Sequence, residues 1–170
     1  MKHLRTVILF CALAAVGWWL WTIFFPSQEK IIRGRLADLA NTVSFTGKEN
    51  VIVRANNIGR LPTFFAPEVE INIDLLDQDG RTIESHRIVG HDEIAQAAQG
   101  AHATGGTVQV EFMDPVVKLA ADKESAVVNV TLRAKIPRDA NFIIQEMKFT
   151  LKKVKKDWLI IRVETVKTLA

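Results

Sequence analysis

Tyrosine is absent from this chain of 170 residues, and cysteine occurs once, as Cys11. A single cysteine excludes a disulfide within the chain and any metal site built from several cysteines. The lack of tyrosine excludes an oxyanion hole that depends on a phenol. The 5 prolines and 9 glycines are scattered. No linker rich in these residues therefore divides the chain into several soluble domains.

Charge of either sign is missing between Val7 and Phe25, where apolar residues are interrupted only by Gly17 and Thr22. At about 1.5 Å per residue, a helix over this run covers nearly the whole ~30 Å hydrocarbon layer of a membrane. Three tryptophans gather near its C-terminal end, where such rings prefer the interface. The sequence therefore predicts three parts, which are a basic N-terminal segment 1–6, a transmembrane anchor 7–25 and one domain 26–170.

The same N-terminus has features of a cleaved signal peptide, because Lys2 and Arg5 precede the apolar run. The run is longer than the usual ~7–15 residue apolar core of a signal peptide. It ends in Phe24 and Phe25 before Pro26, not in small residues suited to a signal peptidase. We therefore expect a retained signal-anchor in a single-pass membrane protein. Basic residues on the two sides nearly balance, and we expect the domain to be exocytoplasmic, periplasmic or extracellular.

Positive charge is only slightly in excess, with 22 Lys and Arg against 19 Asp and Glu. The densest basic group, at positions 152, 153, 155 and 156, flanks a predicted turn and is interpreted as a solvated hairpin end. No basic cluster is interleaved with stacking aromatic residues. The sequence thus predicts no nucleic-acid partner.

Apolar spacing predicts three helices in the domain, over Ser27–Phe45, Lys48–Leu61 and Gly90 to about Ala103. Alternating residues predict a strand over 69–75, a turn at 78–80 and a returning strand over Thr82–Val89. The rest of the chain has strand periodicity in four segments, which are Thr107–Leu119, Ser125–Ile136, Phe142–Val154 and Trp158–Leu169. This order of elements predicts an α+β domain.

The last hairpin can be placed in register by burial, with Val154 opposite Trp158. This pairing sets Lys148 opposite Glu164, and its extension to the preceding strand sets Arg133 beside Glu146. One face of the sheet is then apolar, while the other carries a ladder of alternating charges.

Three segments carry a resemblance to a known family: Phe64-Phe65-Ala66-Pro67-Glu68-Val69, Val89-Gly90-His91-Asp92-Glu93-Ile94, and the hairpin with Phe149-Thr150-Leu151-Lys152-Lys153 and Asp157-Trp158-Leu159-Ile160. In order and spacing, the chain from about Glu29 to Leu169 resembles the nuclear transport factor 2-like superfamily, which includes ketosteroid isomerase-like and SnoaL-like polyketide cyclase proteins. The resemblance implies a cystatin-like cone, with N-terminal helices on a curved, mainly antiparallel sheet. It also implies an apolar cavity between helices and sheet, and frequent dimerisation through the outer face of the sheet.

The resemblance does not by itself imply an enzyme, because this fold also hosts ligand binders and assembly modules. Ketosteroid isomerase-like chemistry is excluded by the missing tyrosine. Dehydratase-like relatives use histidine with acids, which leaves Asp74, His86 and Asp114 as weak catalytic candidates. His102, near a predicted helix end, is rated lower, because a cation is favoured there by the helix dipole. Neither a metal site nor a cofactor is predicted.

The apolar sheet face admits two interpretations, a ligand cavity or a plain core beneath the first helix. The cavity candidates are Val110, Phe112, Val130, Leu132, Met147 and Phe149. The charged face is either solvated or a dimer surface. The dimer-face candidates are Arg133, Glu146, Lys148, Trp158, Arg162 and Glu164.

Taken together, these patterns predict a membrane-anchored, non-catalytic binding or assembly module, a homodimer with partners in the same membrane. Anchoring favours this hypothesis, because a tether raises the effective concentration of partners in the bilayer. The alternative is a cavity enzyme of the isomerase, dehydratase or cyclase type that acts on an apolar small molecule.

Overall fold

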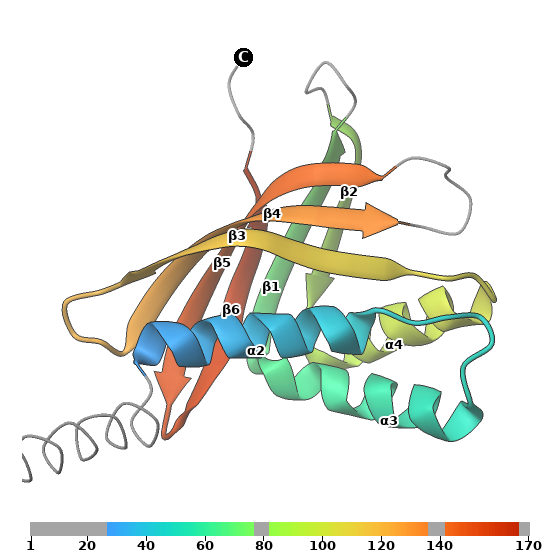
Figure 1. The fold of residues 1–170 in the computed structure, drawn as a ribbon, viewed down its shortest axis with the longest axis horizontal. Coiled ribbons are helices and arrows are strands. Elements are labelled where there is room, and N and C mark those ends of the chain that lie inside the picture. Colours follow the sequence, from blue (N-terminus) through green and yellow to red (C-terminus); the bar gives the residue numbers. More distant parts are fainter. Residues whose placement is uncertain (1–26, 77–81, 136–141, 167–170) are drawn as a thin grey trace, which may run out of the picture. The chain divides into compact units, whose positions relative to one another are not determined.

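The computed structural model describes residues 27–76, 82–135 and 142–166 (Figure 1). Its helices are α2 (Gln28–Val43), α3 (Val51–Arg60), the short 3₁₀ helix η1 (Leu61–Phe64) and α4 (Gly90–Ala103). Its strands are β1 (Phe65–Leu76), β2 (Thr82–Val89), β3 (Gln109–Leu119), β4 (Ser125–Lys135), β5 (Ile143–Val154) and β6 (Asp157–Thr165). The predicted anchor 7–25 and turn 78–80 lie outside the described residues. Within the described ranges, no helix has both the length and the apolar character needed to cross a membrane.

The six strands form one mixed sheet in the order β2-β1-β6-β5-β4-β3. Neighbouring strands are antiparallel except for β1 and β6, which are parallel. The three α-helices gather over one end of the sheet, and the strands extend beyond them (Figure 1). The predicted α+β architecture is therefore confirmed.

Side chains cap the starts of the helices. The hydroxyl of Ser27 accepts a hydrogen bond from the backbone N–H of Lys30 at 3.3 Å. Asn50 caps α3 by accepting from the N–H of Ile52 at 2.9 Å. At α4 the carboxylate of Glu93 reaches back to the N–H of Val89 at 2.7 Å. The Ser27 and Asn50 bonds satisfy backbone donors that the first turn of a helix leaves without an internal partner, whereas the Glu93 bond joins the first turn of α4 to the last residue of β2.

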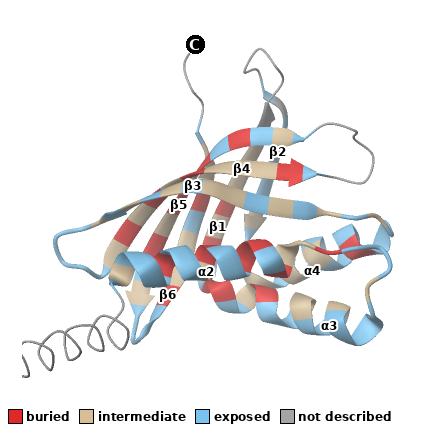
Figure 2. Cartoon of the chain, viewed as in Figure 1, coloured by how far each residue is buried: buried red, intermediate tan, exposed pale blue. Residues whose placement is uncertain are grey.

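One apolar core joins α2 to the sheet (Figure 2). Ile32 and Leu36 of α2 are at most 1% exposed, as are Val128 of β4 and Leu151 of β5. Burial of each such side chain contributes about 1.5–3 kcal/mol relative to exposure. Helix α3 differs, because none of its residues is buried and the side chains of its first turn, including Ile52, are exposed.

The predicted register of the last hairpin holds only for its far half, where Lys148 lies opposite Glu164. Near the turn Val154 pairs with Asp157 and not with Trp158, and a bulge at Ile161 restores the predicted pairing beyond it. The turn is one residue shorter than predicted, with Lys155 in the left-handed region at φ 58°. The extra residue of the Ile161 bulge compensates for this.

The predicted pairing of β4 with β5 is wrong by two residues. Thr131 lies opposite Glu146, and Arg133 lies opposite Ile144. A slip of two residues leaves every side chain on its own face, so the burial pattern could not distinguish the two registers. On β3 a bulge separates Met113 from Val116 at the Asp114-Pro115 pair.

Two loops meet at one end of the helices. The loop after α2 contains Gly47, and the loop after α4 contains Gly105 and Gly106. A Cβ atom added at Gly47 would lie 2.2 Å from the carbonyl oxygen of Gly105. Glycine at position 47 is therefore required by the close approach of the two backbones.

Gly47→Ala is expected to destabilise the domain by about 1–3 kcal/mol, because backbone atoms must separate to admit the methyl group. The control is Gly34→Ala in α2, where an added Cβ meets nothing within 4 Å. That change should stabilise the helix by about 0.5–1 kcal/mol. Urea unfolding of both variants measures the difference, and equal stability of the two would refute the close approach.

Candidate functional site

The three predicted catalytic candidates do not come together. The carboxylate of Asp74 on β1 accepts a hydrogen bond from the hydroxyl of Ser85 on β2. His86 on β2 lies 3.1 Å from Glu84 and its side chain is 53% exposed. Asp114 is exposed at the β3 bulge, with a φ of 50°. Four strand steps separate β1 from β3, which is about 19 Å at the usual strand spacing.

A largely apolar cavity of about 220 Å³ lies instead among α2, α3, α4 and the start of β3. Most of the side chains that line it are apolar. The lining residues are Thr42, Val43, Phe45, Asn57, Ile58, Leu61, Ala98, Ala101, His102, Val108 and Val110.

A short strand-like contact forms one wall of this cavity. Phe45 and Val108 each donate a backbone N–H to the carbonyl of the other, both at 2.9 Å. Ser44 extends the contact, because its hydroxyl accepts from the N–H of Val110 at 2.9 Å and donates to the carbonyl of Ala40 at 2.7 Å. The end of α2 is thereby fixed to β3.

His102 is the one ionisable side chain among the lining residues. It is only 7% exposed, and the ring of Phe45 stacks on it with centroids 3.8 Å apart. Burial lowers the pKa of the His102 imidazole below its ordinary value, while the nearby Glu49 opposes this shift and Arg54 adds to it. His102 is therefore neutral near pH 7.

Several polar atoms around His102 are buried without a hydrogen-bond partner among the described residues. These atoms are Nδ1 of His102, Oε2 of Glu49 and Nε of Arg54. The other oxygen of Glu49 accepts from the amide of Asn57 at 3.3 Å. Buried polar groups are normally paired, so this cluster at the cavity is unusual.

The remaining histidine of the described residues has a structural partner. The Nε2 atom of His91 lies 3.0 Å from the carbonyl oxygen of Phe65, which joins the start of α4 to β1. Gly90, just before it, has a positive φ of 77°.

Of the six predicted cavity residues, Val110 lines the His102 cavity. Phe112 lines a separate groove between α2 and β3 and contacts Phe149 edge to face, with centroids 5.2 Å apart. Val130, Met147 and Phe149 are buried in the core, and Leu132 packs partly buried against it. The body of the sheet is thus filled by side chains, and the cavity lies at the helical end.

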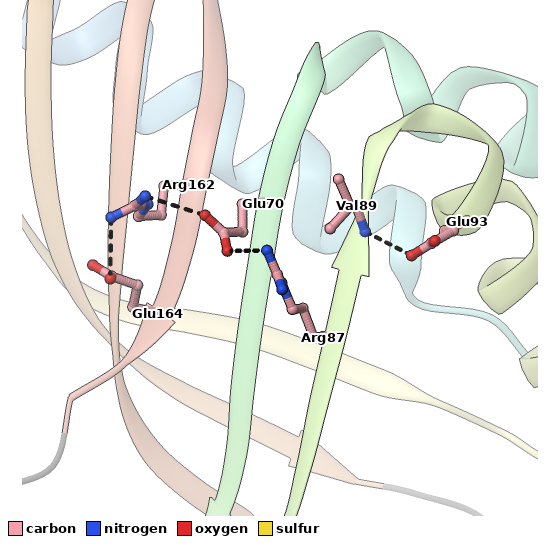
Figure 3. A network of polar contacts seen from close by, with 6 residues as sticks. All are labelled: Glu70, Arg87, Val89, Glu93, Arg162 and Glu164. Carbon is pink, nitrogen blue, oxygen red and sulfur yellow. Dashed lines mark hydrogen bonds and ion pairs between the residues drawn. The ribbon is translucent and has the colours of Figure 1, made fainter.

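The outer face of the sheet carries a network of ion pairs (Figure 3). Glu70 on β1 binds Arg87 on β2 at 3.0 Å and Arg162 on β6 at 3.1 Å. Glu164 in turn lies 3.7 Å from Arg162 and 2.9 Å from Lys148 on β5. A hydrogen bond from Asn72 and the two arginines hold the pKa of the Glu70 carboxyl below its ordinary value.

Five of the six predicted dimer-face residues belong to this outer face. Arg133 lies 3.6 Å from Glu111, and Glu146 accepts from the hydroxyl of Thr131 at 2.7 Å. Trp158 is different, because it is 1% exposed and belongs to the core. The Ile161 bulge explains this, since it places Trp158 and Arg162 on opposite faces although four positions separate them.

No residue pattern pointed to His102 as the site. The helix around it is rich in alanine, and only Ile94 and His102 of α4 are buried. A histidine at the end of a helix is typical of a solvated cation on the helix dipole. Its burial comes from Phe45, which is remote in sequence.

In the described part of the chain, no group of three or more His, Cys, Asp or Glu side chains is placed so that it could hold a metal ion.

Solved structures share this fold at low sequence identity. A chain of the yeast deubiquitinase Ubp3 and Bre5 cofactor complex aligns with a TM-score of 0.59 and 10% identity, over 85% of this chain and 100% of its own. A putative scytalone dehydratase from Novosphingobium aromaticivorans aligns with a TM-score of 0.56 and 14% identity, over 84% and 85% of the two chains. An NTF2-like protein with a cystatin-like fold from the same organism aligns with a TM-score of 0.57 and 14% identity, over 90% of this chain and 86% of its own. No protein-family model and no curated protein matches the chain.

These similarities establish the cystatin-like, nuclear transport factor 2-like α+β fold that the resemblance predicted. They establish the fold alone, since identities of 10–14% accompany proteins as different as a deubiquitinase cofactor complex and a putative dehydratase.

Acid is expected to destabilise the domain through His102. The unfolded chain binds a proton near pH 6.5, the ordinary pKa of histidine, whereas the folded chain binds it only at lower pH. Stability that is complete above pH 6.5 is therefore lost as the pH falls through the folded-state pKa.

His102→Leu should remove this part of the pH dependence. We expect the difference in Tm between pH 7.5 and pH 5 to be smaller in His102→Leu than in the unmodified chain. Thermal unfolding followed by circular dichroism at both pH values measures it. A difference of the same size in the two proteins would show that His102 is not a buried neutral group.

Proposed function

We propose that the domain is a non-catalytic binding module that holds a small apolar molecule in the His102 cavity. The observation that carries this proposal is the cavity of about 220 Å³ with its largely apolar lining. An apolar cavity of about 150 Å³ suffices to bind benzene. A few polar groups within an apolar lining are typical of ligand sites.

Catalysis has less support, because general acid and base chemistry usually pairs titratable groups within hydrogen-bond reach of the reacting atoms. No aspartate or glutamate is among the residues that line the cavity. The one observation that favours the enzyme alternative is His102 itself, because a neutral imidazole in a cavity can accept a proton. Among the structural neighbours, one is described as a putative scytalone dehydratase. A cavity enzyme of the dehydratase type is therefore the second candidate.

The anchor predicted over residues 7–25 remains part of the proposal. It would tether the module to a membrane, with the domain outside the cytoplasm, and raise its effective concentration towards partners in the same bilayer. Apolar small molecules also concentrate in the bilayer, which places ligand and cavity in one compartment.

Dimerisation through the outer face of the sheet is a further part of the proposal. Charges of both signs alternate on this face, so a second copy related by a two-fold axis can meet opposite charges. Apolar surface is present as well, since Ile144 is 65% exposed and Phe142 is 42% exposed beneath the guanidinium of Arg133. A mixed polar and apolar patch is typical of a non-obligate interface.

Toluene is the first probe for the cavity. We expect it to raise the Tm of the protein and to shift the methyl NMR signals of Val43 and Val108. Ala98→Leu narrows the cavity and should weaken toluene binding, because the larger side chain occupies part of the space that the ligand needs. Ala37→Leu, on α2 outside the cavity, is the matched control and should bind as the unmodified chain does. Absence of any shift at millimolar toluene would contradict the binding function.

The dimer is tested by native mass spectrometry of the full chain in detergent. Arg133→Glu and Glu146→Lys each place a like charge against the second copy and should shift the population towards monomer. Arg60→Glu, exposed on α3 away from the sheet, is the control. If both outer-face variants keep the mass of the unmodified protein, the sheet-face interface is rejected.

A further inference from the structure

The start of α3 presents three consecutive aliphatic side chains to solvent. Val51, Ile52 and Val53 are 73%, 77% and 46% exposed, and Figure 2 shows this end of the helix as exposed surface. Single exposed apolar side chains are ordinary, whereas neighbouring ones mark a contact surface. The residues around these three indicate the chemistry of the partner.

We propose that these three residues, the α3 tip, enter the interface of a lipid bilayer that carries anionic headgroups. The bilayer is the one in which the anchor predicted over residues 7–25 would hold the chain. Of the proposed function, this inference requires only the anchor, and neither the cavity nor the dimer.

Helix α3 packs on the domain through its C-terminal half, where Asn57 and Ile58 line the His102 cavity. Its first turn is held by hydrogen bonds within the segment. The side chain of Asn50 accepts from the N–H of Ile52 at 2.9 Å, and the carbonyl of Asn50 accepts from the N–H of Arg54 at 3.0 Å. The α3 tip is therefore displayed on an ordered backbone without being part of the core.

Exposed charges around the α3 tip have one sign. Between α2 and β1 the exposed charged side chains are Lys48 and Arg60. The other two charged residues of this segment, Glu49 and Arg54, are half-buried. Basic side chains beside an apolar patch are typical of segments that bind anionic membrane surfaces. Charge complementarity therefore favours anionic lipid as the partner.

The small size of the α3 tip argues against a protein partner. A specific protein interface buries about 20–30 residues on each side. Its binding energy is concentrated in residues such as Trp, Tyr and Arg. The aromatic residues between α2 and β1, Phe45 and Phe64, are both buried. A fluid bilayer needs no complementary shape, so three aliphatic side chains are enough to enter it.

A tethered domain needs little affinity of its own for the bilayer. The predicted anchor ends at residue 25 and α3 begins at Val51, with the 16 residues of α2 in between. At a rise of ~1.5 Å per residue, α2 is about 24 Å long. So short a connection keeps the α3 tip at a high effective concentration near the membrane surface, where a weak contact suffices.

The test places the full chain in nanodiscs of phosphatidylglycerol and phosphatidylcholine and follows its isoleucine methyl groups by NMR. A nitroxide attached near the lipid headgroup should cause loss of the Ile52 signal, because a paramagnetic centre broadens the signals of nearby nuclei. Ile144 on β5, which is 65% exposed, is the reference in the same spectrum and should keep its signal. Discs of phosphatidylcholine alone should cause a smaller loss at Ile52.

Two matched variants test whether apolar insertion is the cause. Ile52→Gln removes apolar surface from the α3 tip, where no residue is buried, and Ile144→Gln makes the same change at an isoleucine exposed on the sheet. The methyl signals of Val51 report on both. They should recover in Ile52→Gln and stay broadened in Ile144→Gln. Equal loss in the two variants would overturn the inference.

A soluble gadolinium chelate distinguishes the other possible occupants. If the chelate broadens Ile52 and the lipid nitroxide does not, the α3 tip is in water. If neither reagent broadens Ile52, a second copy covers the tip. Either result overturns the inference, while the anchor stands as long as the chain co-elutes with the discs. If the chain does not co-elute with them, the anchor fails and the inference fails with it.

Discussion

The paired hydrogen bonds between Phe45 and Val108 are the contact on which the candidate site depends. They join the chain after α2 to the start of β3. Phe45 is held by them against His102, and Val108 is held beside Phe45 on the same wall of the cavity. The hydroxyl of Ser44 adds a further hydrogen bond between the end of α2 and β3, from the N–H of Val110. These bonds therefore position one wall of the cavity together with the Phe45 ring that covers His102.

The close approach of Gly47 to Gly105 supports the same region from outside. Both loops lie at the ends of helices that line the cavity. After α4, Gly105 adopts a φ of 70°, which glycine accepts without the strain of a side chain. Backbone geometry, and not a large apolar surface, thus positions the loops on this side of the cavity.

Apolar spacing and turn residues were sufficient to predict the elements, as the bounds of β2 and α4 show. Periodicity failed where one inserted residue turns the neighbouring side chains to the opposite face of the sheet. The bulge at Ile161 moved Trp158 into the core while Arg162 stayed outside, and nothing in the local composition marks that bulge. The Asp114-Pro115 bulge was predictable, because proline cannot continue a regular ladder. His102 could not be predicted as a site, because its surroundings come from segments distant along the chain.

The two faces of the sheet place different constraints on function. On the outer face every charge of the Glu70 network has a partner within the same chain, so a second copy must compete with pairs that are already formed. Exposed ion pairs are each worth little, and exchange of one partner for another costs correspondingly little. In the proposed dimer, charges of this kind would therefore select the orientation of the second copy more than they would add affinity. The His102 cavity differs, because its lining is largely apolar and includes no lysine, arginine, aspartate or glutamate.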